Sequence, residues 1–512
     1  MGGLVRGGWI LEEPGRAPAA LPWPGVCQAR APLGWYDSVA VRPRGAAGGL
    51  DGALAGVRAM APAGERRARS TFSLANGSAG LDDYALTLAR GDSLRAFGLD
   101  VMSGRRGAAA GFERSGRHLW GLRARATRGE QQFDANVAQR GTATQLAGLE
   151  EQAASGQSGT LGWRWLRGGT VWRAGFERGL DRHESFGGAL ERSEREAQET
   201  RFLAGGARAS AGRLVDAQLQ WTEATVKRIG NEAFARDART LWGTARAELP
   251  AAGGRLELAL GGGRLGGVDR WEVAPAATWR ARGRGLDATI ALEHDLAPVW
   301  ADLAPGAAPF LQHSWIGTLG IATAGAGPWR ARATLRAGRV HERALAERLP
   351  LEELWLRAGL RDESGTYDLA LADGALEWQG RHAGAGLDGF GLAHRSSASA
   401  AGAPRADPDA GFRAWTGVRA TFFGGDLGVA LRGEAAGIGA RVAGLAPPRR
   451  LPGYVTCAAL CELTLGDAVI VVRARNLEDR PRPQSWIDSV TGLPALTGRR
   501  DLGLSLTWRL FN

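Results

Sequence analysis

The sequence predicts an all-β fold: a transmembrane antiparallel β-barrel of about 22 strands with short periplasmic turns and long extracellular loops. Three observations lead to this prediction. Apolar and polar residues alternate in many runs, these runs are longer than strands of soluble proteins, and the connectors between them are alternately short and long. The composition agrees, because 77 Gly and 19 Trp in 512 residues suit Gly-rich turns and aromatic strands.

The C-terminal segment 500–512 shows the alternation most clearly. Its large apolar residues are expected to face lipid, namely Leu502, Leu504, Leu506 and Leu510. The residues between them are expected to face the lumen, namely Gly503, Ser505, Thr507 and Arg509. An open sheet edge is not stable in lipid, because its backbone groups have no hydrogen-bond partners there. We therefore expect this last strand to pair with the first and close the barrel.

The same period of two occurs in the runs 118–129, 213–221, 286–294 and 351–361. Runs of about 10–13 residues exceed the 5–6 typical of soluble strands. They match the length of about 9–11 that a tilted membrane strand requires. Counting back from the C-terminus places the first strand near Arg69.

The connectors indicate which ends of the strands lie together. Short turns are predicted at 128–130, 167–169, 283–285, 325–328, 424–426 and 466–467. Longer polar segments are predicted to be loops at 141–156, 180–198, 226–236, 296–310, 381–409, 437–452 and 477–499. An even number of strands places both ends of the barrel on the short-turn, periplasmic side. Five tryptophans suit interfacial girdles: Trp120, Trp163, Trp221, Trp271 and Trp508.

The charge and the cysteines exclude some functions. The net charge is +11 and Lys227 is the only lysine. The arginines are scattered through strand-like runs, so no nucleic-acid partner is expected.

Cys457 and Cys461 share a strand face about 13 Å apart, too far for a disulfide. With Cys27 they are interpreted as small apolar residues, and a CxxxC metal half-site is the alternative. No apolar run is long enough for a membrane helix, and Arg6, Glu12 and Glu13 leave no export signal at the N-terminus.

Two segments carry a family resemblance. In 471–510 a strand runs into Asn476, Leu477, Glu478, Asp479 and Arg480, and a loop, a Gly498-Arg499 step and the closing strand follow. This order resembles the end of TonB-dependent outer-membrane receptors. Segment 36–62, with short strands at 37–41 and 56–60 around an Arg/Pro/Gly-rich turn, resembles the last part of their plug domain, although its RPRG departs from the usual Arg-Gly-Pro.

The resemblance implies two domains. Residues 1–68 would be the remnant of a plug domain and its linker, and residues 69–512 the transmembrane β-barrel. A signal peptide, the TonB-contacting segment and most of the plug would then lie upstream of Met1. One departure concerns Phe511, which is out of phase with the lipid-facing residues, whereas such barrels usually end in an aromatic residue in phase with them.

No catalytic, metal or cofactor residues are predicted, and the ligand-binding residues are unknown. The seven histidines are scattered, and GRLGG (263–267) and AGAGLDGFG (383–391) are interpreted as turns or loops rather than phosphate loops. A solvated surface is favoured over a ligand entrance for six loop residues: Asp181, His183, Glu184, His382, Asp407 and Asp409. Four arginines are expected to face the lumen, and they are interpreted as partners of acidic side chains rather than as groups that attract an anionic ligand: Arg123, Arg125, Arg357 and Arg361.

The resemblance implies a TonB-dependent receptor-like transporter in the outer membrane, not an enzyme, for a small-molecule or metal-chelate ligand of the siderophore, cobalamin or glycan class. The implied partners are outer-membrane lipid, the barrel assembly machinery and, if an upstream plug exists, the TonB energy-transducing complex. The alternative functions are a passive porin-like or structural barrel and a soluble repeat β-protein.

Overall fold

The computed structural model describes the barrel strands and part of the N-terminal region. The described residues are 10–12, 38–43, 55–60, 69–77, 81–91, 95–106, 112–146, 151–186, 192–210, 212–229, 234–265, 271–283, 285–299, 310–323, 327–344, 363–396, 410–443, 449–480, 483–487, 494–496 and 500–510. No α-helix occurs among them, so none of these residues forms a helix long and apolar enough to cross a membrane.

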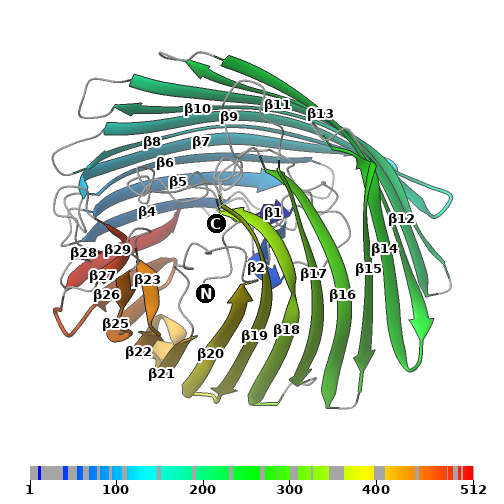
Figure 1. Cartoon of the computed structure of the whole chain (residues 1–512). Helices are drawn as coiled ribbons and strands as arrows, with labels where there is room; N and C mark the ends of the chain where they lie inside the picture. Colours follow the sequence, from blue (N-terminus) through cyan, green and yellow to red (C-terminus); the bar gives the residue numbers. More distant parts are fainter. Residues whose placement is uncertain are drawn as a thin grey trace.

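Twenty-two strands form one closed antiparallel barrel within the described chain (Figure 1). They are β4 (Arg69–Gly77), β5 (Leu81–Gly91), β6 (Arg95–Arg106), β7 (Phe112–Arg128), β8 (Gln131–Leu146), β9 (Glu151–Arg167), β10 (Thr170–Phe186), β11 (Arg192–Ser210), β12 (Arg213–Ile229), β13 (Phe234–Ala251), β14 (Gly254–Arg264), β15 (Trp271–Arg282), β16 (Leu286–Val299), β17 (Phe310–Thr323), β18 (Trp329–Ala344), β19 (Glu363–Gln379), β20 (Ala383–Ser396), β21 (Ala410–Phe422), β22 (Leu427–Ile438), β25 (Tyr454–Leu465), β26 (Ala468–Arg475) and β29 (Asp501–Leu510). A 3-10 turn, η5 (Phe423–Gly425), connects β21 and β22.

The barrel closes between its last and first strands, as the sequence predicts. Strand β29 pairs antiparallel with β4, placing Leu506 opposite Leu74 and Trp508 opposite Phe72. The first barrel strand begins at Arg69, where it was expected. The C-terminal strand is therefore ordered because both of its edges are hydrogen-bonded, to β26 on one side and β4 on the other.

The six predicted short turns all connect neighbouring strands at one end of the barrel. Three of the tightest contain glycines with positive φ, Gly129, Gly168 and Gly466, a conformation that two-residue hairpin turns require. Short connections between β11 and β12, between β13 and β14 and between β19 and β20 were not predicted.

The predicted boundaries of several loops are wrong. Strands β8 to β11 run through 141–146, 151–156, 180–186 and 192–198, which were predicted as loop. The segment AGAGLDGFG lies within strand β20, so its interpretation as a turn or loop is also wrong. The predicted strand 351–361 lies outside the described residues, and the strands before and after it, β18 and β19, pair directly with each other.

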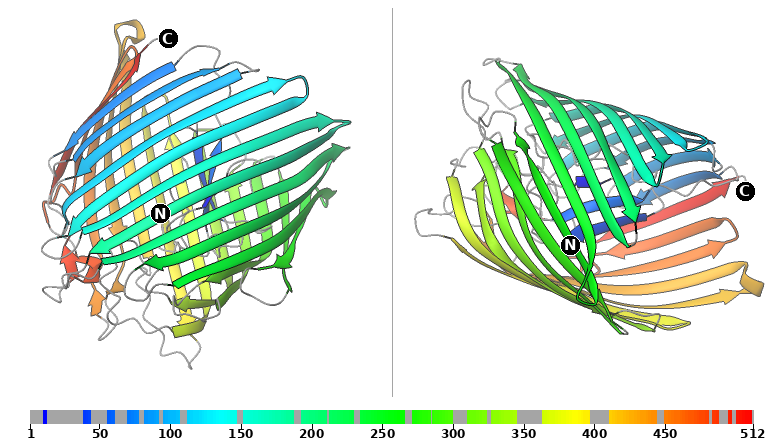
Figure 2. Two further views of the ribbon diagram at one scale, coloured as in Figure 1. Left: turned by 90° about the horizontal axis from the view of Figure 1, so that it is seen from above. Right: turned by 90° about the vertical axis from the view of Figure 1, so that its right-hand side faces the viewer.

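The strands differ greatly in length around the barrel. Strand β11 has 19 residues and β13 has 18, whereas β26 has 8 and β4 has 9. Figure 2 shows the long strands side by side on one part of the tilted wall and the shorter C-terminal strands on another.

The register places one continuous apolar face around the whole barrel. Leu504 on β29 follows Val472 on β26, and the same row continues through Cys461 on β25 and Leu431 on β22. Leu502, Leu504 and Trp508 are each about half exposed, as expected for side chains that face lipid. The five tryptophans expected in girdles all occupy positions of this face, which we call the outward face.

Three small sheets accompany the barrel. Strands β1 (Ile10–Glu12), β3 (Ala55–Met60) and β2 (Ser38–Pro43) form a sheet in that order, and β2 and β3 occur where short strands were expected. The ribbon shows this sheet inside the ring of barrel strands (Figure 1). Two hairpins, β23 (Arg441–Ala443) with β24 (Arg449–Leu451) and β27 (Pro483–Ile487) with β28 (Pro494–Leu496), lie in the connections at the end opposite the short turns.

Candidate functional site: the charged lumen wall

The positions that alternate with the outward face line the barrel lumen. Because successive side chains of a strand point to opposite faces, each run with an apolar outward face presents the residues between to the lumen. Many of these residues are arginines and acids, and they pair across neighbouring strands. This inward face borders the lumen, in which the sheet of β1, β3 and β2 lies.

The densest group of ion pairs spans strands β13 to β15 near the short-turn end. Glu257 accepts hydrogen bonds from Arg246 at 2.8 Å and from Arg280 at 2.8 Å. Glu248 pairs with Arg255 at 2.6 Å. Both carboxylates are mostly buried, whereas Arg255 and Arg280 are more than half exposed. Each buried acid therefore has cationic neighbours, and the exposed guanidinium groups give this part of the wall a positive surface.

A second group on β10 and β11 is almost completely buried. Arg201 lies between Glu199, at 2.9 Å, and Glu177, at 3.3 Å. The side chains of Arg201 and Glu199 are 5% and 2% exposed. Ions of both signs are tolerated at such low exposure only when paired, because an isolated buried charge costs several kcal/mol.

Further pairs continue the charged wall around the lumen. Arg173 pairs with Asp216, Arg336 lies 3.4 Å from Asp373, and Arg413 lies 2.8 Å from Glu434. Arg432 approaches the same Glu434 at 3.5 Å, and its guanidinium carbon lies 4.4 Å from the ring centroid of Trp415. Except for Arg432 with Glu434, which both belong to β22, these contacts join different strands, so they also fix the register of the wall.

One part of the inward face is apolar. Trp242 on β13 is 2% exposed and forms a buried cluster with Leu265, Ala274 and Leu296. Its indole lies over Gly261 of β14, where an added Cβ would come within 2.8 Å of the ring. A glycine is therefore required at position 261, which is diagonal to Trp242 in the register.

Four lumen arginines were predicted to pair with acidic groups, and the one whose side chain is described does so. Arg125 pairs with Asp134 at 2.6 Å. Arg123 belongs to the same strand, β7, at the next inward position, and its side chain is not described. Arg357 and Arg361 lie outside the described residues.

The four of the six loop residues that the structure describes do not form a common site. Asp181, His183 and Glu184 belong to strand β10, so their assignment to a loop is wrong. His382 lies in the short turn between β19 and β20. It therefore cannot line an extracellular ligand entrance, because this turn is at the opposite end of the barrel from the long connections. Asp407 and Asp409 lie outside the described residues.

The segment Asn476–Arg480, which carries part of the family resemblance, has a structural role that the sequence did not reveal. Asn476 and Asp479 adopt positive φ angles of 50° and 55°. The Asp479 carboxylate accepts a hydrogen bond from the backbone N–H of Arg500 at 2.9 Å, and the Arg500 guanidinium donates to the Leu477 carbonyl at 3.0 Å. The motif thus fastens the turn after β26 to the start of β29, next to the closing seam.

The described part of the chain contains no cluster of side chains arranged to bind a metal ion. No group of three or more His, Cys, Asp or Glu side chains there is arranged to hold a metal ion. Cys457 and Cys461 are both free thiols at outward positions of β25. This position agrees with the interpretation of these two cysteines as small apolar residues.

Comparison with known proteins identifies the fold. No protein-family model and no curated protein sequence matches the chain. Among solved structures, the copper transporter OprC superposes with a TM-score of 0.80 at 11% identity, over 98% of this chain and 90% of OprC. The FrpB iron transporter of Neisseria meningitidis gives 0.75 at 9% identity, over 99% and 92%. The ferric yersiniabactin uptake receptor FyuA of Yersinia pestis gives 0.75 at 11%, over 91% and 84%.

These similarities define the class of structure. The chain has the 22-stranded barrel fold of TonB-dependent outer-membrane receptors. This confirms the predicted fold class and the family resemblance at the level of fold. The names of the similar structures describe transporters and receptors.

Proposed function

We propose that the chain is a TonB-dependent receptor-like transporter of the outer membrane for a small-molecule or metal-chelate ligand. The observation that carries the proposal is the closed barrel of 22 strands with an ion-paired lumen wall and a small sheet inside it. A barrel of this size encloses a wide lumen, and such a lumen serves selective transport only if another part of the chain fills it.

Residues 1–68 are proposed to be the end of a plug domain and its linker. The sheet of β1, β3 and β2 supports this assignment, because it lies within the ring of barrel strands (Figure 1). The superpositions on OprC and FrpB cover 98% and 99% of this chain, so they extend beyond the barrel into the N-terminal region.

The ligand class is proposed from the similar structures and from the wall. OprC is named a copper transporter, FrpB an iron transporter and FyuA a receptor for ferric yersiniabactin. By analogy a metal ion or metal chelate is the first ligand class to test here, before cobalamin and glycans. We propose the barrel assembly machinery and the TonB complex as partners, and no enzymatic activity.

Uptake and conductance together test this function. Cells carrying the full-length gene are supplied with iron only as one ferric siderophore from a panel, and growth is compared with a strain lacking the gene and a strain lacking the TonB complex. We expect growth on at least one chelate to require both the gene and the TonB complex.

The passive-pore alternative predicts a different result. A porin-like barrel gives stable conductance steps in a planar bilayer and supports uptake without the TonB complex. The receptor proposal is abandoned if the purified chain shows such steps and no chelate, copper salt or cobalamin depends on the TonB complex for uptake.

A further inference from the structure

A groove crosses the outward face over strands β7 to β12. It has a volume of about 770 Å³ and is lined almost entirely by apolar side chains. Ala174 on β10 and Ala204 on β11 are opposite each other in register and lie in its floor. Larger residues surround this floor, including Phe133, Trp163 and Leu219. The groove is therefore a depression in the lipid-facing wall made where small residues lie between aromatic ones.

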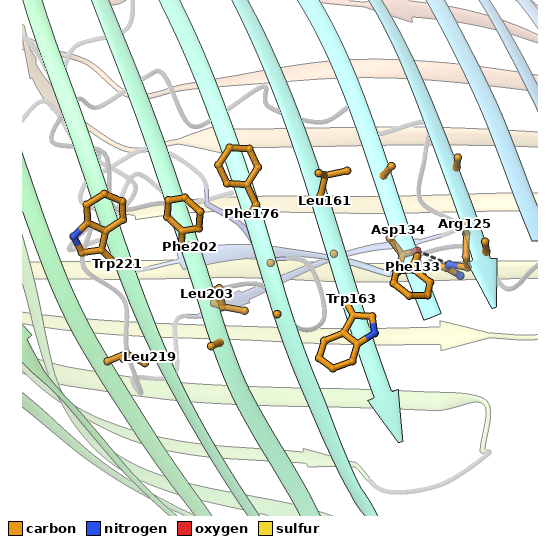
Figure 3. A pocket seen from close by; sticks show the side chains of 17 residues that line it. Arg125, Phe133, Asp134, Leu161, Trp163, Phe176, Phe202, Leu203, Leu219 and Trp221 are labelled. Atoms are coloured by element: carbon orange, nitrogen blue, oxygen red, sulfur yellow. Dashed lines mark hydrogen bonds and ion pairs between the residues drawn. The ribbon is translucent and has the colours of Figure 1, made fainter. Parts of the chain in front are cut away.

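The groove has an aromatic border on its extracellular side. Leu161, Phe176, Phe202 and Trp221 occupy one register row on β9 to β12, and their side chains lie side by side in Figure 3. The Phe176 and Phe202 rings are 5.1 Å apart, and the Phe202 and Trp221 rings 5.4 Å apart.

The next outward row in the extracellular direction marks the lipid boundary. It contains Arg178, Thr200, Glu223 and Arg239, which follow one another in register on β10 to β13. Polar and charged residues here, directly after a row of aromatics, place the edge of the apolar band at this height.

Arginines border the same strands on the periplasmic side. Arg167 at the end of β9 and Arg208 on β11 are both register partners of Thr170 on β10. The two arginines are exposed, and within the described residues neither forms an ion pair. Arg167 lies against Trp165, with 4.8 Å between guanidinium carbon and ring centroid. Strands two positions apart are separated by about 9.5 Å. The two long side chains can therefore reach one phosphate placed over Thr170.

The distances fit a lipid whose headgroup lies at the periplasmic boundary. Arg178 lies eight residues along β10 from Thr170, or about 26 Å along the strand. At a strand tilt of about 40° this corresponds to about 20 Å along the membrane normal, close to the height of about 25 Å of the apolar band of such barrels. Thr170 and Arg178 therefore mark the two edges of the band. A headgroup at Thr170 would thus place its acyl chain along the groove and end it near the aromatic border, about 15 Å away along the normal.

We propose that this groove is a binding site for one anionic phospholipid of the periplasmic leaflet. Arg167 and Arg208 bind its phosphate with Thr170 between them, and an acyl chain fills the groove over Ala174 and Ala204. The charge of the two guanidinium groups selects an anionic headgroup over a zwitterionic one, because the latter carries its own cation. The proposal rests on the proposed outer-membrane location, but not on the transported ligand.

Lipid affinity of the intact protein tests the site. The full-length protein is extracted from outer membranes, stripped of lipid and titrated with phosphatidylglycerol in detergent, and bound lipid is counted by native mass spectrometry. We expect one tight phosphatidylglycerol site. Arg167→Gln and Arg208→Gln should each weaken it about fivefold, and more in combination. Arg381→Gln, which removes an exposed arginine from a turn at the same end of the barrel, is the matched control and should leave it unchanged.

Filling the groove tests the acyl part separately. Ala204→Phe should weaken phosphatidylglycerol binding while both arginines remain, whereas Ala333→Phe at another outward position should not. The proposal is overturned if phosphatidylethanolamine binds equally well, if the arginine variants match the Arg381 control, or if the groove is covered by a second copy of the chain in a stable dimer. Failure of the outer-membrane location would appear earlier, as protein that is recovered without detergent.

Discussion

Asp479 offers a quantitative test of how the barrel seam is fastened. Its carboxylate accepts the backbone N–H of Arg500 at 2.9 Å, and its φ is 55°. A hydrogen bond to a charged group contributes about 1.5–3 kcal/mol, and the exposed position favours the lower value. A left-handed conformation costs an alanine about 1 kcal/mol or more, whereas Asp, Asn and Gly tolerate it better. Asp479→Ala should therefore lower the free energy of unfolding by about 2.5 kcal/mol.

Two further substitutions separate these contributions. Asp479→Gly removes the hydrogen bond but relieves the backbone strain, so it should lower the unfolding free energy by about 1.5 kcal/mol. Asp479→Asn keeps a side-chain oxygen and tolerates the positive φ, so its loss should stay below about 1 kcal/mol.

The assay is reversible urea unfolding in detergent micelles or lipid vesicles, followed by tryptophan fluorescence and by heat-modifiable gel migration. Asn, Gly and Ala should destabilise the barrel in that order. An alanine variant within about 0.5 kcal/mol of the wild type would refute the structural role of the motif. So would a glycine variant less stable than the alanine variant.

Two other pairs of substitutions test the inward and outward faces. Gly261→Ala should destabilise the barrel by about 1–3 kcal/mol, because the new methyl group overlaps the Trp242 indole. Gly433→Ala, where an added Cβ meets nothing within 4 Å, is its control and should be neutral, and equal urea midpoints for the two variants would contradict the packing argument. Ile290→Arg, in the middle of the outward face of β16, should cost about 2–4 kcal/mol of folding free energy in a bilayer, against about 0–1 for Leu286→Arg beside the turn. The membrane placement of this face fails if both variants refold in vesicles with the same stability.

The sequence predicts the membrane-embedded part of the strands well because lipid imposes a simple rule there. In 501–510 every outward position is large and apolar, so the period of two is visible without any structure. Closure could be predicted for the same reason, since lipid excludes an open edge.

The predictions fail where this rule ends. Strands β8 to β11 continue past the apolar band, and both of their faces then meet water or other polar groups. No alternation remains in 141–146 or 180–186, so these segments resemble loops. The misassigned strand β20 has another cause: Gly384, Gly386, Gly389 and Gly391 are typical of turns, whereas Gly384 and Gly386 in fact make room for the Trp415 ring. His382 was assigned to the wrong end of the barrel through the same error.

The candidate site could be predicted only in its chemistry. That lumen arginines pair with acids follows from the cost of an unpaired charge in a low-dielectric wall. Which acid each arginine meets depends on the register between strands. A two-residue turn fixes that register, but only when its bounds are known to the residue, since a slip of one residue moves every side chain to the other face. The predicted turn 128–130 is one residue longer than the turn 129–130 of the structure. The pairing of Arg125 with Asp134 across β7 and β8 is one example. The arginine pair on either side of Thr170 is another, because it exists only as a cross-strand relation.

The unequal strand lengths give the mouth of the barrel a high side and a low side. On the high side, strands of up to 19 residues extend beyond the apolar band as a hydrogen-bonded wall. On the low side, beside strands of 8 to 10 residues, the two hairpins β23–β24 and β27–β28 touch each other through β23 and β27. Within the described residues, the mouth is therefore bordered by long strands on one side and by two contacting hairpins on the other.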